Sequence, residues 1–247
     1  MTRVLATYNI KGGVGKTSAA VNLAWLASRE GRRTLLWDLD PQSAATYLLR
    51  VQPKLRGGAR KLVRLRSPVT KLVRESDHPG LDLLPADMSL RHLDLALDRR
   101  RRPTQRLRRI VEPLREDYDL IVLDCPPSLS LVSESVFELA DALLVPVIPA
   151  ALPVRAFGQL RSRVKDRSAV LAFGSMVDAQ RPLHRLLMAQ LRAEHPGQVL
   201  GASIPLDEDV ERMGTERTVV GELAPGSRAA AAYRALWWDI NARLAGR

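Results

Sequence analysis

The sequence predicts an open, doubly wound α/β fold, in which helices flank a single, mostly parallel sheet. Short runs rich in valine, isoleucine and leucine alternate with longer stretches of helical period along the chain. Most of the short runs are apolar at every position, as strands are when helices cover both faces of a parallel sheet. The length of 247 residues suits one such domain and is too short for two ordinary ones. We therefore expect a single domain over residues 1–247.

Seven runs are the candidate strands, and the Ala- and Leu-rich segments between them supply the helices. Sheets of this kind bind ligands beyond the carboxyl ends of their strands, so residues at those ends are the first candidates for a site. The run 142–154 contains three prolines and is shorter than the about 20 residues of a bilayer span, so no transmembrane helix is expected. The candidate strands span 4–8, 34–37, 81–84, 120–123, 142–147, 170–173 and 199–204.

Positive charge is concentrated in one block of the chain. The chain has 38 Lys+Arg and 27 Asp+Glu, which gives a net charge of +11. Residues 50–109 hold 17 cations, 14 of them arginine, and 6 anions, so the whole excess lies there. Such an excess favours polyanions, either nucleic acid or an acidic membrane surface, although a solvated face would carry the same charge. Within this block, the basic segment 50–80 has no clear period and is a candidate for a partly mobile segment.

A glycine loop follows the first strand and leads directly into an alanine-rich helix. The loop has the sequence Lys-Gly-Gly-Val-Gly-Lys-Thr over residues 11–17. Its glycines let backbone N–H groups surround a phosphate, and the helix start adds its positive end. Lys16 is expected to reach the outer phosphates of a nucleotide and Thr17 to ligate Mg²⁺, whereas a plain glycine turn would not require Lys-Thr at this point. The predicted nucleotide-binding residues of the loop are Gly12, Gly13, Val14, Gly15, Lys16, Thr17 and Ser18.

The loop departs from the standard phosphate-loop pattern, because Ile10 stands five positions before Gly15 and a second lysine, Lys11, stands at the front. This form resembles the deviant Walker A loop of the ParA/MinD family of partition ATPases. The resemblance implies a P-loop domain that uses ATP and Mg²⁺ and forms a homodimer around two ATP molecules. In the family the leading lysine, here Lys11, reaches the nucleotide of the other subunit. Pairing would then depend on the charge of the triphosphate, so loss of the γ-phosphate would loosen the dimer.

Two aspartates follow the second candidate strand in the sequence Asp-Leu-Asp-Pro-Gln over residues 38–42. This sequence is similar to a switch motif of the family, which implies that Asp40 positions the attacking water and that Asp38 lies near the metal and the phosphates. A carboxylate beside a triphosphate is repulsive unless Mg²⁺ or a water lies between them, so a purely structural role is the poorer account. We therefore expect Lys11, Lys16 and Asp40 to be the catalytic residues.

The strand 120–123 is four apolar residues followed by Asp124, which is the Walker B arrangement. The continuation Asp-Cys-Pro-Pro is typical of the ParA branch. Asp124 is expected to hold Mg²⁺ through a water, so the predicted metal site consists of Thr17, Asp38 and Asp124. Cys125 is interpreted as a small packing residue rather than a nucleophile, because no histidine stands near it in the sequence.

The resemblance extends to the last two candidate strands. Asp178 and Pro205 stand where the family contacts the adenine base, although a loop cap and a strand terminator would have the same residues. ATP-bound ParA dimers bind DNA without sequence preference through basic residues of the C-terminal half. The stretch 206–211 is acidic here, which departs from the family pattern, so the contact could lie in the 50–109 block instead. The C-terminal candidates are Arg181, Arg185 and Arg192, spaced to share a helix face, and Arg212 and Arg217.

The resemblance also implies partners and a location. A ParB-like or other cargo adaptor protein would stimulate slow ATP hydrolysis, and the cargo would be a plasmid, a chromosome or a protein assembly. The start of the chain lacks the apolar core of a secretion signal, so a cytoplasmic, nucleoid-associated protein is expected and a membrane partner is not.

Two alternatives stay open. A MinD-like membrane ATPase is suggested by an apolar helical stripe near the C-terminus, although a terminal helix docked on the sheet has the same stripe. An ATP-dependent amide-forming enzyme would need a second substrate pocket, for which no acid/base cluster is evident, because the four histidines are scattered and expected at the surface. An iron–sulfur reductase is excluded, because it needs two cluster cysteines per subunit and the chain has 1. The stripe consists of Tyr233, Leu236, Trp237, Ile240 and Leu244.

Overall fold

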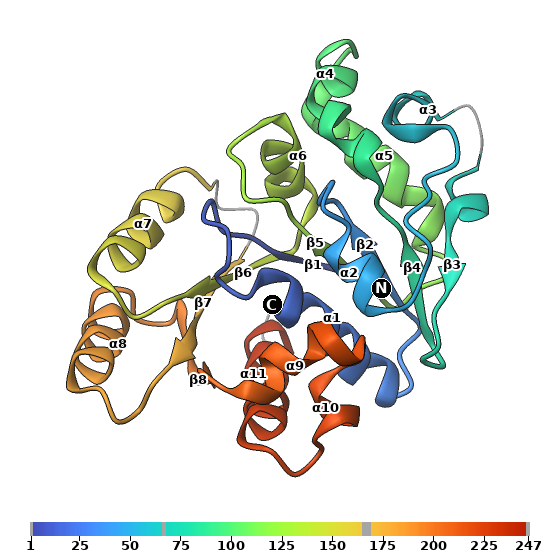
Figure 1. Ribbon diagram of the computed structural model, residues 1–247. Helices are drawn as coiled ribbons and strands as arrows, with labels where there is room; N and C mark the ends of the chain where they lie inside the picture. The colour runs from blue at the N-terminus through green and yellow to red at the C-terminus, as the bar shows by residue number, and fades with distance from the viewer. Residues whose placement is uncertain (1, 66–67, 165–168, 246–247) are drawn as a thin grey trace.

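The computed structural model describes residues 2–65, 68–164 and 169–245. These residues form an eight-stranded sheet in the order β3-β4-β2-β5-β1-β6-β7-β8 (Figure 1). Neighbouring strands are parallel except for β3 and β4, which are antiparallel. The prediction of a doubly wound, mostly parallel sheet is confirmed. The strands are β1 (Arg3–Thr7), β2 (Thr34–Asp38), β3 (Arg74–Glu75), β4 (Leu81–Leu84), β5 (Leu120–Asp124), β6 (Ala142–Val147), β7 (Ala169–Val177) and β8 (Val199–Pro205).

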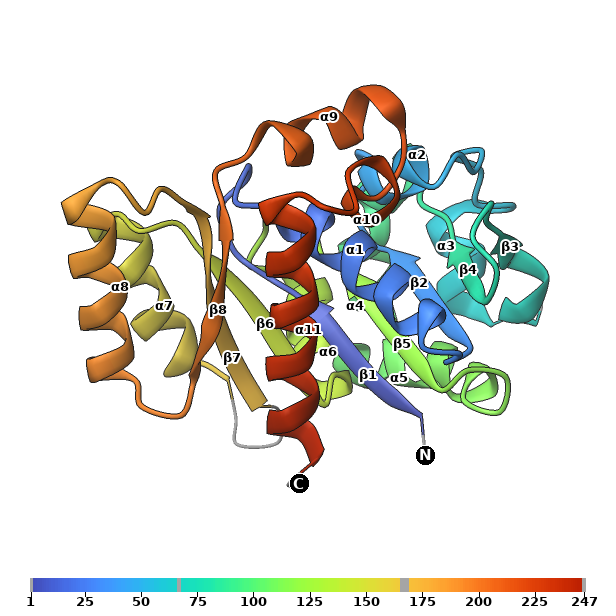
Figure 2. The same cartoon turned by 90° about the horizontal axis from the view of Figure 1, so that it is seen from below.

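Helices cover both faces of the sheet, as Figure 2 shows. The residues of α1, α2, α9, α10 and α11 share a core with one face, and those of α3 to α8 share a core with the other. Short 3₁₀ turns, labelled η, connect several of them. The helices and turns are α1 (Lys16–Arg29), α2 (Ala44–Leu48), α3 (Gly58–Arg64), η1 (Val69–Leu72), η2 (Met88–His92), α4 (Leu93–Asp98), η3 (Pro103–Gln105), α5 (Arg106–Val111), η4 (Glu112–Leu114), α6 (Leu131–Leu139), α7 (Ala151–Arg161), α8 (Pro182–Glu194), α9 (Glu208–Glu216), α10 (Val220–Leu223) and α11 (Arg228–Ala245).

The two cores explain why the central strands are apolar at every position. Successive side chains of a strand point to opposite faces of the sheet. Leu35 and Trp37 of β2 accordingly belong to the core under α3 to α8, whereas Leu36 belongs to the core under α1 and α11. Every residue of β2 and β5 is buried, because neither face of the sheet is solvated there.

The C-terminal helix α11 docks on the sheet. The five residues of its apolar stripe are all buried beside α1 and β8. This packing confirms the interpretation of the stripe as a docking face. Among the described residues, no helix is both long and apolar enough to cross a bilayer.

Segment 50–80 contains elements that the sequence did not indicate. In its described part, α3, η1 and the short strand β3 bury apolar residues such as Leu62 and Val69 in the core. The mobility of this segment stays a prediction. The sequence predicted His78 at the surface, and this expectation is wrong. His78 is buried, and its Nδ1 lies 3.1 Å from Oε1 of Glu222, a residue of α10 that is distant in the sequence.

Candidate nucleotide-binding site

The predicted site residues meet at the carboxyl ends of three neighbouring strands. Thr7 ends β1, Asp38 ends β2 and Asp124 ends β5, and both Thr7 and Asp38 are in register with Asp124. The Thr7 hydroxyl donates a hydrogen bond to Asp124 Oδ1 over 3.3 Å. The loop 11–18 leaves β1 at the same place, which lies at the centre of the sheet. We call this region, with the aspartates and the loop, the nucleotide edge.

The loop backbone is shaped by glycines at two left-handed positions. Gly13 has φ 69° and Gly15 has φ 88°, a conformation that L side chains rarely adopt. A Cβ atom at Gly15 would also stand 2.9 Å from the Ser175 hydroxyl. That hydroxyl donates a hydrogen bond of 2.9 Å to the carbonyl of Val14, which joins the loop to β7. The loop therefore has little freedom to rearrange, and its amides are preorganised.

Asn9 fixes the entrance of the loop. Its Nδ2 donates to the Pro146 carbonyl of β6 over 2.8 Å, and its Oδ1 accepts from the Lys11 N–H over 3.0 Å. The sequence analysis did not predict Asn9 and Ser175 as site residues. Only their contacts in the folded chain show that they support the loop.

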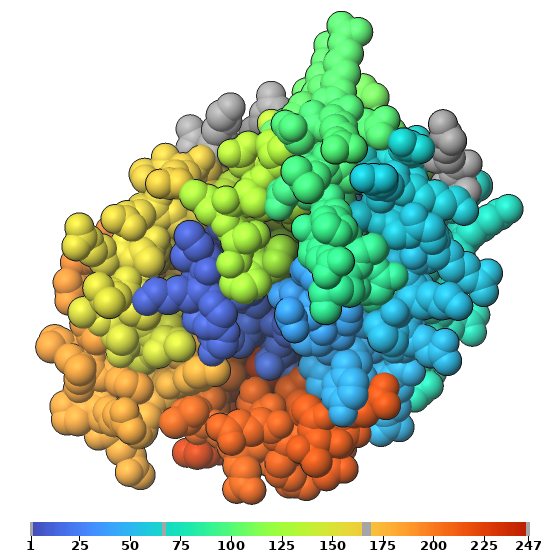
Figure 3. Space-filling view, turned by 45° about the horizontal axis from the view of Figure 1, so that its top comes forward, coloured from blue at the N-terminus to red at the C-terminus, as the bar shows by residue number. Residues whose placement is uncertain are grey.

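The two lysines of the loop differ in environment. Lys16 is buried, and its Nζ donates to the carbonyl of Lys11 over 2.9 Å. Burial lowers the pKa of Lys16, while the negative charges of Asp124 and Asp40 act in the opposite direction. The Lys11 ammonium is partly exposed and makes no hydrogen bond or ion pair with any described residue. Figure 3 shows this N-terminal segment reaching the surface between the parts of the chain around α6 and α7.

Asp38 is buried and held by protein hydrogen bonds. Its Oδ2 accepts from the Thr46 N–H over 2.9 Å and from the Thr46 hydroxyl over 2.7 Å, and its Oδ1 accepts from the Asp40 N–H over 3.0 Å. The Thr46 hydroxyl in turn accepts from the Ala86 N–H over 3.0 Å. Burial raises the pKa of Asp38 to about 6 despite these hydrogen bonds. Asp38 therefore joins the end of β2 to α2 and to the exit of β4.

Asp124 is the most deeply buried carboxylate of the nucleotide edge together with Asp38. It is fully buried, and its Oδ2 has no hydrogen-bond partner in the part of the chain that the structure describes. Burial, followed by the charge of Asp38, raises the pKa of Asp124 to about 8. A divalent cation would compensate both effects, so the donor set fits Mg²⁺. Among the described residues, no group of three or more His, Cys, Asp or Glu is placed to hold a metal ion.

Asp40 begins a tight turn between β2 and α2. Its Oδ1 accepts from the Gln42 N–H over 2.9 Å, and its carbonyl accepts from the Ser43 N–H over 2.9 Å. Its carboxylate is partly exposed and close enough to Lys16 to act on the pKa of that ammonium.

Cys125, the residue after Asp124, is buried, and burial raises the pKa of its thiol well above the ordinary value, which agrees with a packing role.

The two adenine candidates lie side by side, because Val177 at the end of β7 pairs with Pro205 at the end of β8. Asp178 follows Val177 and is already occupied as a loop cap. Its Oδ1 accepts from the Gln180 N–H over 2.9 Å, and its Oδ2 from Arg181 Nε over 3.1 Å. The contact of Asp178 and Pro205 with a base stays a prediction.

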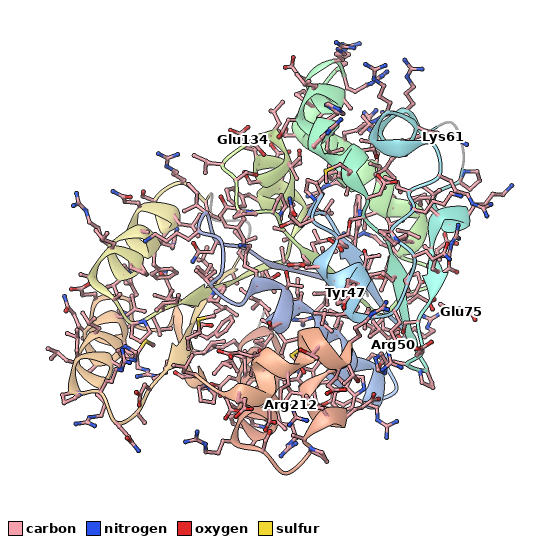
Figure 4. All side chains as sticks on the ribbon, in the orientation of Figure 1. Tyr47, Arg50, Lys61, Glu75, Glu134 and Arg212 are labelled. Atoms are coloured by element: carbon pink, nitrogen blue, oxygen red, sulfur yellow. The ribbon has the colours of Figure 1, made fainter. Side chains whose placement is uncertain are left out.

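The five C-terminal arginines do not gather on one surface, and each already has a protein partner. Arg185 lies on α8 and donates to the Ala179 carbonyl, whereas Arg181 is the residue directly before that helix. Figure 4 labels Arg212 on α9, away from α8, with Asp209 3.1 Å from its guanidinium. The remaining partners are Asp178 for Arg181, the Gly201 carbonyl for Arg192, and the carbonyl and ring of Tyr47 for Arg217.

A glycine loop between a central strand and a helix, with a buried lysine and two strand-end aspartates, defines a P-loop ATPase of the doubly wound α/β class. Comparison with known proteins supports the same class. The family model described as an AAA domain matches residues 2–170. Among curated relatives, the chromosome-partitioning ATPase Soj of Thermus thermophilus is 33% identical, and the match covers 98% of this chain and 96% of the relative. The chromosome partitioning protein ParA of Caulobacter vibrioides is 32% identical over 82% of this chain and 80% of its own. The chain belongs to the ParA/MinD family of partition ATPases.

Solved structures add the fold and the cofactors. One solved structure is that of a Mycobacterium smegmatis protein described as a cobyrinic acid a,c-diamide synthase, with a bound ATP analog and magnesium. It is 26% identical to this chain, and it superposes with a TM-score of 0.83 over 100% of this chain and 97% of that chain. The septum site-determining protein MinD of Pyrococcus horikoshii, complexed with Mg-ADP, is 19% identical with a TM-score of 0.81 over 100% of this chain and 98% of its own, and shows the fold alone. ATP and Mg²⁺ are the cofactors of this ATPase family.

Proposed function

We propose that this chain is a ParA-like ATPase in which residues 1–247 act as a single domain. Its ATP-bound homodimer would bind DNA without sequence preference and position a plasmid, chromosome or protein cargo. The observation that carries the proposal is the Lys11 ammonium, which stands at the mouth of a preorganised phosphate loop without a partner among the described residues. Lys11 and Lys16 belong to the same loop, and a triphosphate approaching from another subunit would compensate the positive charge of Lys11.

The loop residues supply the binding energy. Backbone amides of Gly12, Gly13, Val14 and Gly15 would surround the phosphates, with Lys16 on the outer ones. Ser18, in the first turn of α1, would contact the phosphates next to Thr17. The Thr17 hydroxyl, Asp124 and Asp38 would hold Mg²⁺, with Asp124 acting through a water. The ion would supply positive charge next to the phosphates. Asp178 and Pro205 would border the adenine.

Hydrolysis needs a water aligned with the γ-phosphate. We assign this task to Asp40, whose carboxylate lies in the turn after β2, close to Lys16. The water oxygen would form a bond to the γ-phosphorus while the bond from that phosphorus to ADP breaks, and a proton of the water would pass to an oxygen of the phosphate that is formed. Lys11 and Lys16 would stabilise the negative charge of the transferred group. Once phosphate leaves, the partner's nucleotide no longer holds Lys11, and the dimer loosens. A ParB-like or other cargo adaptor would accelerate this step, and DNA-bound dimers would place the protein on the nucleoid in the cytoplasm.

The experiment is size-exclusion chromatography with light scattering, with Mg²⁺ and either ADP or a non-hydrolysable ATP analogue. The proposal expects a monomer with ADP and a dimer with the analogue, and it expects retention on random-sequence DNA only in the second state. A chain that stays monomeric with the analogue would exclude the proposed cycle.

An ATP-dependent amide-forming enzyme is the second candidate, because the Mycobacterium smegmatis structure that covers the whole chain has that description. It would consume ATP in proportion to a carboxylate and an amide donor. ATP hydrolysis measured with a panel of small carboxylates plus glutamine, and separately with DNA, distinguishes the two. Stimulation by DNA alone favours the partition ATPase, and stimulation by one carboxylate favours the ligase.

A further inference from the structure

A cavity of about 410 Å³ lies between α3, η2 and the end of α4, away from the loop 11–18. Its wall includes Arg60 and Arg64 of α3, His92 of η2, and Arg99 and Arg100 after α4. None of the residues that line it is acidic. Figure 3 shows the chain around α4 as a projecting ridge, and Figure 1 places α3 beside it. We call this site the arginine cavity.

The walls of the arginine cavity are fixed by hydrogen bonds of η2. Asp87 Oδ2 accepts from the Leu55 N–H over 2.7 Å, and Asp87 Oδ1 accepts from the Ser89 N–H over 2.9 Å. The Ser89 hydroxyl accepts from the Ala59 N–H over 3.1 Å. The Asp87 carboxylate is therefore held by two backbone N–H groups and makes no ion pair with an arginine of the cavity among the described residues.

The cations of the cavity have no counter-charge in the part of the chain that the structure describes. The guanidinium groups of Arg60, Arg64 and Arg99 are exposed and make no hydrogen bond or ion pair there. The Nε of Arg100 is buried without a partner. Burial lowers the pKa of Arg106, and the neighbouring charges of Arg109 and Arg100 lower it further. Such a cluster is repulsive until an anion binds to it.

The shape and extent of the cluster identify the anion. Arginine suits phosphate, because its planar fork can donate two hydrogen bonds to one group. Arg60 and Arg64 are one helical turn apart, so they present both forks on the same side of α3. Exposed arginines continue beyond the cavity at Arg101, Arg102 and Arg109, farther than a small ligand would need. An extended polyanion uses such a continuation.

We propose that the arginine cavity is where the protein grips the phosphate backbone of DNA, in place of the C-terminal arginines, which already have protein partners. The inference rests on the proposed function, in that it assumes binding to DNA, and it adds the site. The contact is made to phosphodiester groups and is independent of base sequence.

The test compares variants that each lose two positive charges. Arg60→Gln with Arg64→Gln changes the cavity, and Arg29→Gln with Arg155→Gln changes two exposed arginines of α1 and α7. Affinity for a random-sequence DNA duplex is measured with a non-hydrolysable ATP analogue and Mg²⁺ at several salt concentrations. We expect the cavity variant to bind about tenfold more weakly, with a salt slope smaller by about 2, and the control to stay within about twofold of wild type.

Several outcomes overturn the inference while leaving the proposed function intact. They are DNA affinity unchanged in the cavity variant, an equal loss in the control, or a loss found instead in Arg181→Gln with Arg185→Gln. Weaker binding of inorganic pyrophosphate with unchanged DNA affinity would show that the cavity takes a small phosphate compound. A wild-type dimer that retains no DNA would instead contradict the proposed function itself. ATPase activity without DNA should match wild type in the cavity variant and in the control, which reports that the fold is preserved.

Discussion

The nucleotide edge and the arginine cavity handle charge in opposite ways. At the nucleotide edge Lys16, Asp38 and Asp124 are buried, and most of their polar atoms have a specific partner in the fold. In the arginine cavity the charges are mostly exposed, of one sign, and without carboxylate partners among the described residues. A buried charge is stable only when it has hydrogen-bond or ionic partners in the right positions. Exposed charges each contribute little, so their effect on binding depends on how many of them contact the ligand.

The difference teaches what each region can recognise. A rigid set of buried groups can align one phosphorus, one metal ion and one water, so a single substitution should disable it. A set of equivalent exposed cations can hold a polymer in many registers, so a single substitution should only weaken it.

The largest effect is expected for Asp40→Ala. Loss of the group that aligns the water should lower ATP turnover by about 100-fold or more, while ATP binding and dimerisation persist. Steady-state phosphate release and nucleotide titration measure the two properties, and Asp117→Ala, at an exposed aspartate before β5, is the matched control outside the nucleotide site. Unchanged turnover would remove Asp40 from the mechanism.

The next effect is expected for Lys11→Ala. The variant should bind ATP within a few-fold of wild type, because Lys16 and the amides remain, but its dimer with a non-hydrolysable analogue should be weaker by about tenfold or more. Light scattering over a concentration series gives the dissociation constant of the dimer. A variant that pairs as tightly as wild type would show that Lys11 acts only within its own subunit.

Asp124 predicts a pH effect. Its pKa is about 8 in the folded chain and about 4 in the unfolded chain, so the folded state holds the proton more tightly. Without Mg²⁺, the free energy of unfolding should therefore fall as the pH rises from about 4 to about 8. Mg²⁺ with a nucleotide should stabilise wild type more at pH 8 than at pH 6.

Asp124→Asn is the matched neutral variant for this prediction. Thermal unfolding of the variant should show a flatter pH dependence without metal, apart from the contribution of Asp38, and little response to Mg²⁺. An undiminished Mg²⁺ response in the variant would place the ion elsewhere.

The smallest effect is expected for one arginine of the cavity. Arg99→Gln should weaken DNA binding only about threefold and reduce the salt slope by about 1, because one phosphate contact of several is lost. Filter binding or fluorescence anisotropy at two salt concentrations is sufficient. A complete loss of binding from this change would contradict the contrast between the two regions.

The sequence predicted that the loop and the aspartates lie together at one edge of the sheet, since these features are local, while their roles stay predictions. Seven strands were located because burial on both faces makes them continuously apolar, and the loop and the aspartates are adjacent to strand ends in the sequence. The supports of the loop could not be found in this way, since Asn9 acts through Pro146 and Ser175 through Val14. The prediction that His78 is exposed was wrong for the same reason, because its partner Glu222 on α10 is distant in the sequence.

The basic block shows the limit of composition. The charge count located an excess of cations but gave no shape, because α3 and the short antiparallel strand β3 lack a recognisable period. The segments η2 and α3 are separated in the sequence. The cavity forms where Asp87 and Ser89 accept hydrogen bonds from the N–H groups of Leu55 and Ala59 and so hold η2 against α3. Whether arginines scatter over a surface or line one hollow is decided by such contacts.

The hydrogen bonds of Asp38 have a mechanical consequence. Asp38 binds Thr46, Thr46 binds the Ala86 N–H, and the next residue, Asp87, fixes the wall of the arginine cavity. A short series of hydrogen bonds therefore connects the nucleotide edge to the wall of the arginine cavity. If the turn after β2 shifts when phosphate departs, these hydrogen bonds would transmit the shift to the cavity and change its affinity for DNA. Binding of DNA would then change the affinity for ATP by the same factor.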